Sequence, residues 1–228
     1  MRQKNLTAFT LIEMLVVIAI IATIAAFAVP ALTSALTKGQ MTGTMNNARQ
    51  LYLAGYQMAL DGAANGDANL AWPGDYTAGT VTTLKDYVEK LVQNDYLKAS
   101  DLAKMLSAPG ASCTAIGTTA GGGIVAVTLT GNSGLKVYPV KDNDSSNVIF
   151  STTSNFVYGT ALNNTSSPYG DKGFVVVRKG GDGSVLRKNN AVAIAGQEPT
   201  FESNVGKKPG EPQGTVTPGD PLGVLKQP

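Results

Sequence analysis

The sequence has 228 residues, contains no histidine and has a single cysteine, Cys113. Without histidine the chain cannot build a Ser-His-Asp or Cys-His nucleophile pair, a His-ligated zinc site or an imidazole general base. A lone cysteine excludes an internal disulfide and a Cys-x-x-Cys redox or metal pair. These absences remove most common designs of active site, so we predict that the chain is not an enzyme.

Charge is also scarce, because charged residues make up 15% of the chain against roughly 25% in typical soluble domains. The 18 Lys and Arg residues exceed the 16 Asp and Glu residues by a formal charge of only +2, so we expect no nucleic-acid partner. A hydrophobic content of 43% is enough for a packed core. The length is that of one domain with appendages.

The longest apolar run extends from Phe9 to Val29, and Glu13 is its only charged residue. With a rise of about 1.5 Å per residue, a helix of this length spans about 30 Å, the thickness of a bilayer's hydrocarbon core. Arg2 and Lys4 precede the run, which places the N-terminus in the cytoplasm. A signal-peptide core is shorter, at about 7–15 residues. We therefore predict a single-pass membrane segment.

Glu13 is the unusual residue of this segment. A carboxylate inside a membrane helix costs about 2.5–3.5 kcal/mol on insertion scales, so it needs compensation. No charged residue lies between Met14 and Thr37 to supply it. The remaining source is a free α-amino group at the head of a neighbouring helix, which exists only if the chain is cut nearby.

The segment Ala8-Phe9-Thr10-Leu11-Ile12-Glu13, followed by Met14–Ile18, resembles the class III signal of type IV pilins and type II secretion pseudopilins. The resemblance implies that a prepilin peptidase cuts between Ala8 and Phe9 and that the amino group of Phe9 is methylated. Glu13 would then neutralise the amine of an adjacent subunit during assembly. Pro30 matches the family's helix-kinking proline, whereas Ala8 stands where the family normally has glycine.

The resemblance implies a filament subunit, most like a major pseudopilin, that forms a helical homopolymer. Its expected partners are prepilin peptidase, an inner-membrane assembly platform, minor pilins and membrane lipid. Its expected location is the bacterial inner membrane, with a cytoplasmic N-terminus and a periplasmic or extracellular C-terminal domain. A secretion pseudopilus is favoured over an extended pilus by a small margin. The alternative is a monomeric, membrane-tethered binding module that contacts carbohydrate or an exported protein through a loop around Trp72.

The predicted fold class is α+β, with one long N-terminal helix that covers a small antiparallel sheet. Apolar residues at helical spacing continue beyond the membrane segment and indicate a face that packs on a globular head. A near match to a capping box, Thr83 to Asp86, begins a short helical insertion. The expected divisions are a leader at 1–8, a membrane and filament-core helix at 9–29, an amphipathic continuation at 30–61, a head at 62–195 with its helical insertion at 83–107 and sheet at 121–195, and a Pro/Gly-rich tail at 196–228.

Residues of alternating or β-branched character predict the strands of the head. Gly131-Asn132-Ser133-Gly134 and Gly180-Gly181-Asp182-Gly183 are expected hairpin turns. The strands expected are Ile124–Thr130 with Leu135–Val140 and Phe174–Lys179 with Ser184–Lys188, and the segments Val148–Thr152 and Asn155–Tyr158 are candidates for one more strand. The tail is expected to be flexible or to lie extended against the domain.

Few side chains suggest ligand chemistry. Asp142 and Asp144 alternate as oxygen ligands do in calcium loops, but the glycine and distal glutamate of an EF-hand are missing. A polar turn is the favoured interpretation, and structural calcium is a weak alternative; no other cofactor is expected. We expect Trp72 to anchor its loop rather than to form a binding platform, and Cys113 to be an isolated thiol.

Overall fold

A computed structural model describes residues 9–120 and 123–227. The chain divides into two compact units, Met1–Gly39 and Gln40–Pro228. The described residues form helices and small antiparallel sheets, which confirms the predicted α+β class.

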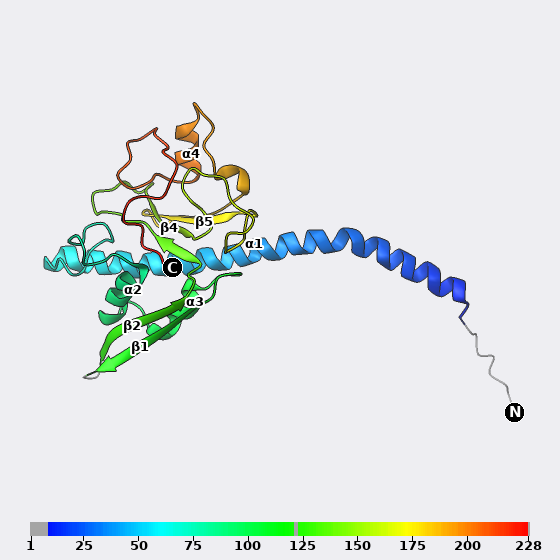
Figure 1. The fold of residues 1–228 in the computed structure, drawn as a ribbon, viewed down its shortest axis with the longest axis horizontal. Coiled ribbons are helices and arrows are strands. Elements are labelled where there is room, and N and C mark those ends of the chain that lie inside the picture. The colour runs from blue at the N-terminus through cyan, green and yellow to red at the C-terminus, as the bar shows by residue number, and fades with distance from the viewer. Residues whose placement is uncertain (1–8, 121–122, 228) are drawn as a thin grey trace. The chain divides into compact units, whose positions relative to one another are not determined.

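The first unit contains the N-terminal part of helix α1, Leu11–Asn65. Every described side chain from Phe9 to Leu36 is exposed in the isolated chain, and this part of α1 is long and apolar enough to cross a membrane. Pro30 lies inside the helix without ending it. Figure 1 draws α1 as one unbroken helix. A helix whose apolar side chains are exposed on all sides matches a segment that lipid or other helices surround.

The second unit begins with the rest of α1, which supplies one wall of the core. Sequence periodicity predicts a core-facing stripe of Met41, Met45, Ala48, Tyr52 and Ala59. All of these are buried except Met45, which is half-buried. Leu51 and Met58 complete the buried face. The helical periodicity of this segment therefore gave the correct core-facing side.

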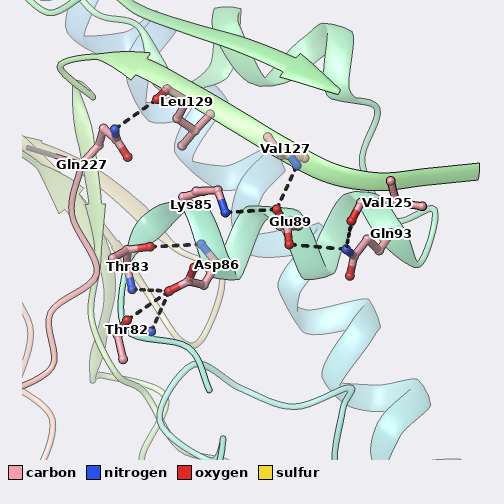
Figure 2. Close-up of polar contacts among 10 residues, drawn as sticks. All are labelled: Thr82, Thr83, Lys85, Asp86, Glu89, Gln93, Val125, Val127, Leu129 and Gln227. Carbon is pink, nitrogen blue, oxygen red and sulfur yellow. Dashed lines mark hydrogen bonds and ion pairs between the residues drawn. The ribbon is translucent and has the colours of Figure 1, made fainter. Parts of the chain in front are cut away.

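Two short helices follow, α2 at Leu84–Gln93 and α3 at Ala99–Leu106, where the helical insertion was predicted. The capping box is present: the Thr83 hydroxyl accepts from the Asp86 amide at 3.2 Å, and the Asp86 carboxylate accepts from the Thr83 amide at 2.9 Å (Figure 2). These bonds satisfy amide groups that have no partner inside the helix.

The strands form two separate antiparallel sheets. A two-stranded sheet pairs β1, Cys113–Ala120, with β2, Gly123–Gly131. A four-stranded sheet has the order β3-β4-β5-β6, with bounds Leu135–Val137, Ile149–Thr153, Phe174–Arg178 and Gly183–Leu186.

The predicted hairpin between 124–130 and 135–140 is therefore wrong. Residues 113–120 are rich in Thr, Ala and Gly, and this weak pattern concealed the true partner of β2. Gly131 adopts a φ of +88°, and the Leu135 amide donates to the Ser133 hydroxyl, so the following turn leads the chain into the other sheet.

The hairpin of β5 and β6 is confirmed, with its Gly-rich turn at residues 179–182. Of the two segments expected to add one more strand, Val148–Thr152 corresponds to β4, whereas Asn155–Tyr158 forms no strand in the described structure. Its aromatic side chains are nevertheless buried, and the Phe156 ring stacks on Phe174 at a centroid distance of 4.0 Å. The apolar pattern there reflects core packing rather than strand pairing.

The tail was expected to be either flexible or extended against the domain. In the structure it packs on the four-stranded sheet. Leu225 forms a β-bridge with Val137. The Asp220 carboxylate accepts from Lys136 Nζ at 2.6 Å and from Tyr138 Oη at 2.8 Å. The tail also includes helix α4, Glu198–Asn204, which follows the short 3-10 turn η1, Lys188–Asn190.

Candidate functional site

Glu13 lies in the first turn of α1, and its carboxylate is held by Thr10. Glu13 Oε2 accepts from the Thr10 amide and from the Thr10 hydroxyl, each at 2.8 Å, while the Glu13 amide donates to Thr10 Oγ1 at 3.2 Å. This reciprocal arrangement is a capping box at the beginning of α1. A negative charge is also favourable there because the amides of the first turn point toward it.

The carboxylate therefore has local donors on its own helix, which the sequence analysis did not predict. The signal was present in the sequence as Thr10-x-x-Glu13 immediately before an apolar helix. Both bonds go to Oε2, and among the described residues no donor reaches Oε1. One oxygen fixes the side chain on its own helix, and the other is free to accept from a second molecule.

The other predicted residues of this region have different placements. Phe9 is 74% exposed and precedes the capping residue Thr10, so a cut before Phe9 would leave the capping box intact. Ala8 lies outside the described residues. Pro30 lies well along α1 from Glu13, and because it has no amide hydrogen, the carbonyl of Ala26 loses its usual donor within the helix.

The threonine hydroxyl groups of the apolar part of α1 bond to their own helix. Thr23 donates to the Ala19 carbonyl at 2.8 Å, Thr33 to the Pro30 carbonyl at 2.9 Å, and Thr37 to the Thr33 carbonyl at 2.9 Å. A threonine that bonds back to a carbonyl three or four residues earlier exposes no unsatisfied donor. These side chains are therefore compatible with a hydrocarbon environment.

The weak calcium candidates lie in a turn of the head that already contains a cation. The carbonyl oxygens of Asp142 and Asp144 both accept from Lys179 Nζ, the second at 2.8 Å. The Asp144 carboxylate accepts from the Lys141 amide, and the Asp142 amide donates to Asp75. No group of three or more metal-ligating side chains occurs in the described parts of the chain. Both carbonyl oxygens are thus bonded to the Lys179 ammonium group, as in a polar turn.

Trp72 anchors its loop, as predicted. The ring is 4% exposed and lies among Tyr52, Tyr56 and Phe150, at centroid distances of 6.2, 6.0 and 6.1 Å. Lys179 Nζ lies 5.4 Å from its ring centroid. A ring that is packed in this way cannot serve as a binding platform, so the alternative of a tethered binding module loses its main residue.

Cys113 is buried at the start of β1, and burial raises the pKa of its thiol. The thiolate is the reactive form, so this environment disfavours disulfide exchange. The residue acts as a small apolar part of the core.

Comparison with known proteins bears on the N-terminal segment. Residues 4–29 match the family model of the prokaryotic N-terminal methylation motif. The chain is also similar to a type IV major fimbrial protein, FimA, from Dichelobacter nodosus, with 36% identity over 81 residues that cover 33% of this chain. It spans about half, 52%, of that relative's length. No solved structure matches the chain. The resemblance to type IV pilins that the residues around Phe9 and Glu13 predicted is confirmed.

Proposed function

We propose that this chain, which carries the N-terminal methylation motif of type IV pilins, is the repeating subunit of a type IV pilus-like filament. One observation carries the proposal: an exposed apolar helix begins with a carboxylate that has one oxygen held and one oxygen free. The role is structural rather than enzymatic.

In the proposed mechanism the subunit first waits in the membrane. Its apolar helix spans the bilayer with the N-terminus on the cytoplasmic side, and the head lies on the other side. Removal of residues 1–8 by prepilin peptidase creates an α-amino group at Phe9. The leader contains Arg2 and Lys4, so its removal also takes away the charges that hold the N-terminus in the cytoplasm.

Assembly then pairs Glu13 of one subunit with the Phe9 amine of its neighbour. Thr10 keeps the Glu13 carboxylate in one orientation, so less side-chain freedom is lost when the amine arrives. The segment between Met14 and Thr37 carries no charge and packs against the same segment of other copies. An assembly platform in the inner membrane and minor pilins are the expected partners in this step.

An extended pilus is favoured over a secretion pseudopilus. The similarity to a major fimbrial protein supports this choice and reverses the small preference that the sequence alone suggested.

The test separates the charge of Glu13 from its role in the capping box. Glu13→Gln keeps a side chain that can accept from Thr10 but removes the charge, whereas Thr10→Ala keeps the charge but removes the hydroxyl. We expect Glu13→Gln to insert in the membrane and lose filament assembly, measured by electron microscopy of sheared filaments. Thr10→Ala should still assemble. Normal filaments from Glu13→Gln would contradict the mechanism.

A further inference from the structure

The two-stranded sheet has edges that differ in how their backbone groups are satisfied. Along the outer edge of β2, the Val127 amide donates to Glu89 Oε2 at 2.8 Å, and the Val125 carbonyl accepts from Gln93 Nε2 at 2.7 Å (Figure 2). The Leu129 carbonyl accepts from Gln227 Nε2 at 3.4 Å. Side chains of α2 and the tail therefore close this edge against other strands.

The register identifies the groups on the opposite edge. The backbone amide and carbonyl groups of Val127 and Leu129 are directed away from β1. In an antiparallel pair the backbone groups of their partners, Gly117 and Ala115, are then directed away from β2. In the part of the chain that the structure describes, no hydrogen bond reaches the outward amide and carbonyl groups of Ala115 and Gly117. Figure 1 shows β1 on the side of the hairpin that faces away from α2.

The ends of this open stretch are defined. The amide and carbonyl of Cys113 are both bonded to Ser107 Oγ, at 3.0 and 3.1 Å, so the open edge begins after Cys113. At the other end the register shifts between Thr118 and Thr119. The open edge is short, and its centre is Ile116.

The open edge also lacks the usual protection of edge strands. Proteins commonly place lysine, proline or an inward charge on such an edge to prevent pairing. Here no charged residue occurs between Met105 and Leu135, and Ile116 is 65% exposed on the solvent face. Two copies could approach along β1 without bringing like charges together.

We propose that β1 is a docking surface for β1 of a second copy of this chain, paired antiparallel about a two-fold axis through Ile116. In this register Ala115 lies opposite Gly117 of the second copy and exchanges both hydrogen bonds with it. On the other side of the axis, Gly117 exchanges the same two hydrogen bonds with Ala115 of the second copy. All the open backbone groups are satisfied, and each exposed Ile116 side chain is covered by the other. This self-complementarity is the argument for a second copy as the occupant.

The pairing adds a second kind of contact to the molecule. It is isologous, whereas polymerisation through Glu13 is head-to-tail, so one contact cannot substitute for the other. Pairing of the β1 edges would join subunits or whole filaments sideways. It does not depend on the proposed function and is testable without filament assembly.

The decisive experiment is disulfide cross-linking of the full chain in detergent micelles, with Cys113→Ala to remove the native thiol. Ile116→Cys places its thiol on the two-fold axis, where opposed Cα atoms lie about 4.5 Å apart and a disulfide can form. The matched control is Thr128→Cys, which lies directly opposite Ile116 on β2, on the same exposed face. In the paired state the two control thiols are three strand spacings, about 14 Å, apart.

We expect the Ile116→Cys chain to give about tenfold more disulfide dimer than the Thr128→Cys chain, because pairing raises the local thiol concentration. Equal cross-linking of both variants, or none from Ile116→Cys, would overturn the proposal. Glu13→Gln added to both chains should leave the difference unchanged, which separates this contact from the polymer contact. Ile116→Lys should lower self-association in sedimentation experiments, and Thr128→Lys should not.

Discussion

Lys179 places its ammonium group 2.8 Å from the main-chain carbonyl oxygen of Asp144, in the turn whose alternating aspartates resemble a calcium loop. The same ammonium group bonds to the Asp142 carbonyl and lies over the Trp72 ring. The side chain of the residue that follows β5 therefore supplies the positive charge of this turn and connects it to the aromatic core.

Lys179→Met should lower the free energy of unfolding by about 2 kcal/mol, because hydrogen bonds to charged groups contribute about 1.5–3 kcal/mol each. Chemical denaturation of the full chain in detergent measures the change, with the exposed Lys172→Met as the control. Calcium or a chelator should not shift the thermal midpoint of the natural chain. A midpoint that rises with calcium would show that the turn binds the ion after all.

Gly55 and Tyr87 form a close contact in the core that a double substitution can test. A Cβ atom at Gly55 would lie 2.1 Å from Tyr87 Oη, and this buried hydroxyl has no hydrogen-bond partner within the described chain. Gly55→Ala should destabilise the head by about 1–3 kcal/mol through overpacking.

Tyr87→Phe should be neutral or stabilising, because it removes a buried hydroxyl without breaking a bond. In the double variant the next contacts of the new methyl group are ring carbons at 3.4 and 3.5 Å, so most of the loss should be restored. Thermal unfolding followed by near-ultraviolet circular dichroism measures all three variants. Additive effects of the two substitutions would contradict the contact.

The pair of Lys136 and Asp220 attaches the tail to the four-stranded sheet. The Lys136 side chain is 3% exposed and that of Asp220 is 19% exposed. Asp220→Ala leaves a buried cation without its partner, which should cost about 3 kcal/mol. The tail should also become sensitive to limited proteolysis. Asp171→Ala breaks the exposed pair with Lys188 and should change stability by less than about 1 kcal/mol.

Tyr96 gives a prediction for alkaline pH. Its hydroxyl donates to Asp61 at 2.7 Å, and this bond, with burial and the nearby charge, raises the pKa of Tyr96 to about 12. The folded pKa lies above the ordinary value of about 10, so the stabilising contribution is complete below pH 10 and is lost as pH rises through 12. Absorbance titration at about 295 nm should show one phenol fewer near pH 12 in Tyr96→Phe. If Tyr96→Phe instead lacks a phenol that titrates near pH 10 in the natural chain, the hydrogen bond from Tyr96 to Asp61 is contradicted.

Sequence reasoning succeeded where a structure depends on near neighbours. The length of α1, its core-facing stripe, the capping box of Thr83 and Asp86, and the turn between β5 and β6 all follow from residues within a few positions of each other. The methylation motif is also local, and it was recognised from Phe9 and Glu13. The hydrogen bond between Thr10 and Glu13 was not predicted, although these residues are only three positions apart in the sequence.

Prediction from the sequence failed where segments far apart in the chain compete for the same partner. Strand β2 could pair with 135–140 or with 113–120, and both candidates have turn residues at the right distance. Nothing near Asp220 indicates that its carboxylate meets Lys136, and nothing near Asp142 indicates Lys179. These outcomes depend on packing and on the burial of charge.

The amino-acid sequence by itself thus determined that the chain has an apolar N-terminal helix with a carboxylate in its first turn, an N-terminal methylation motif and an α+β head. Only the tertiary structure decided which strand edge is closed by Glu89 and Gln93 and which is left open at Ala115 and Gly117. The reason is that helix formation and capping depend on bonds within a few residues. An edge is closed or open according to which distant side chains the fold brings to it.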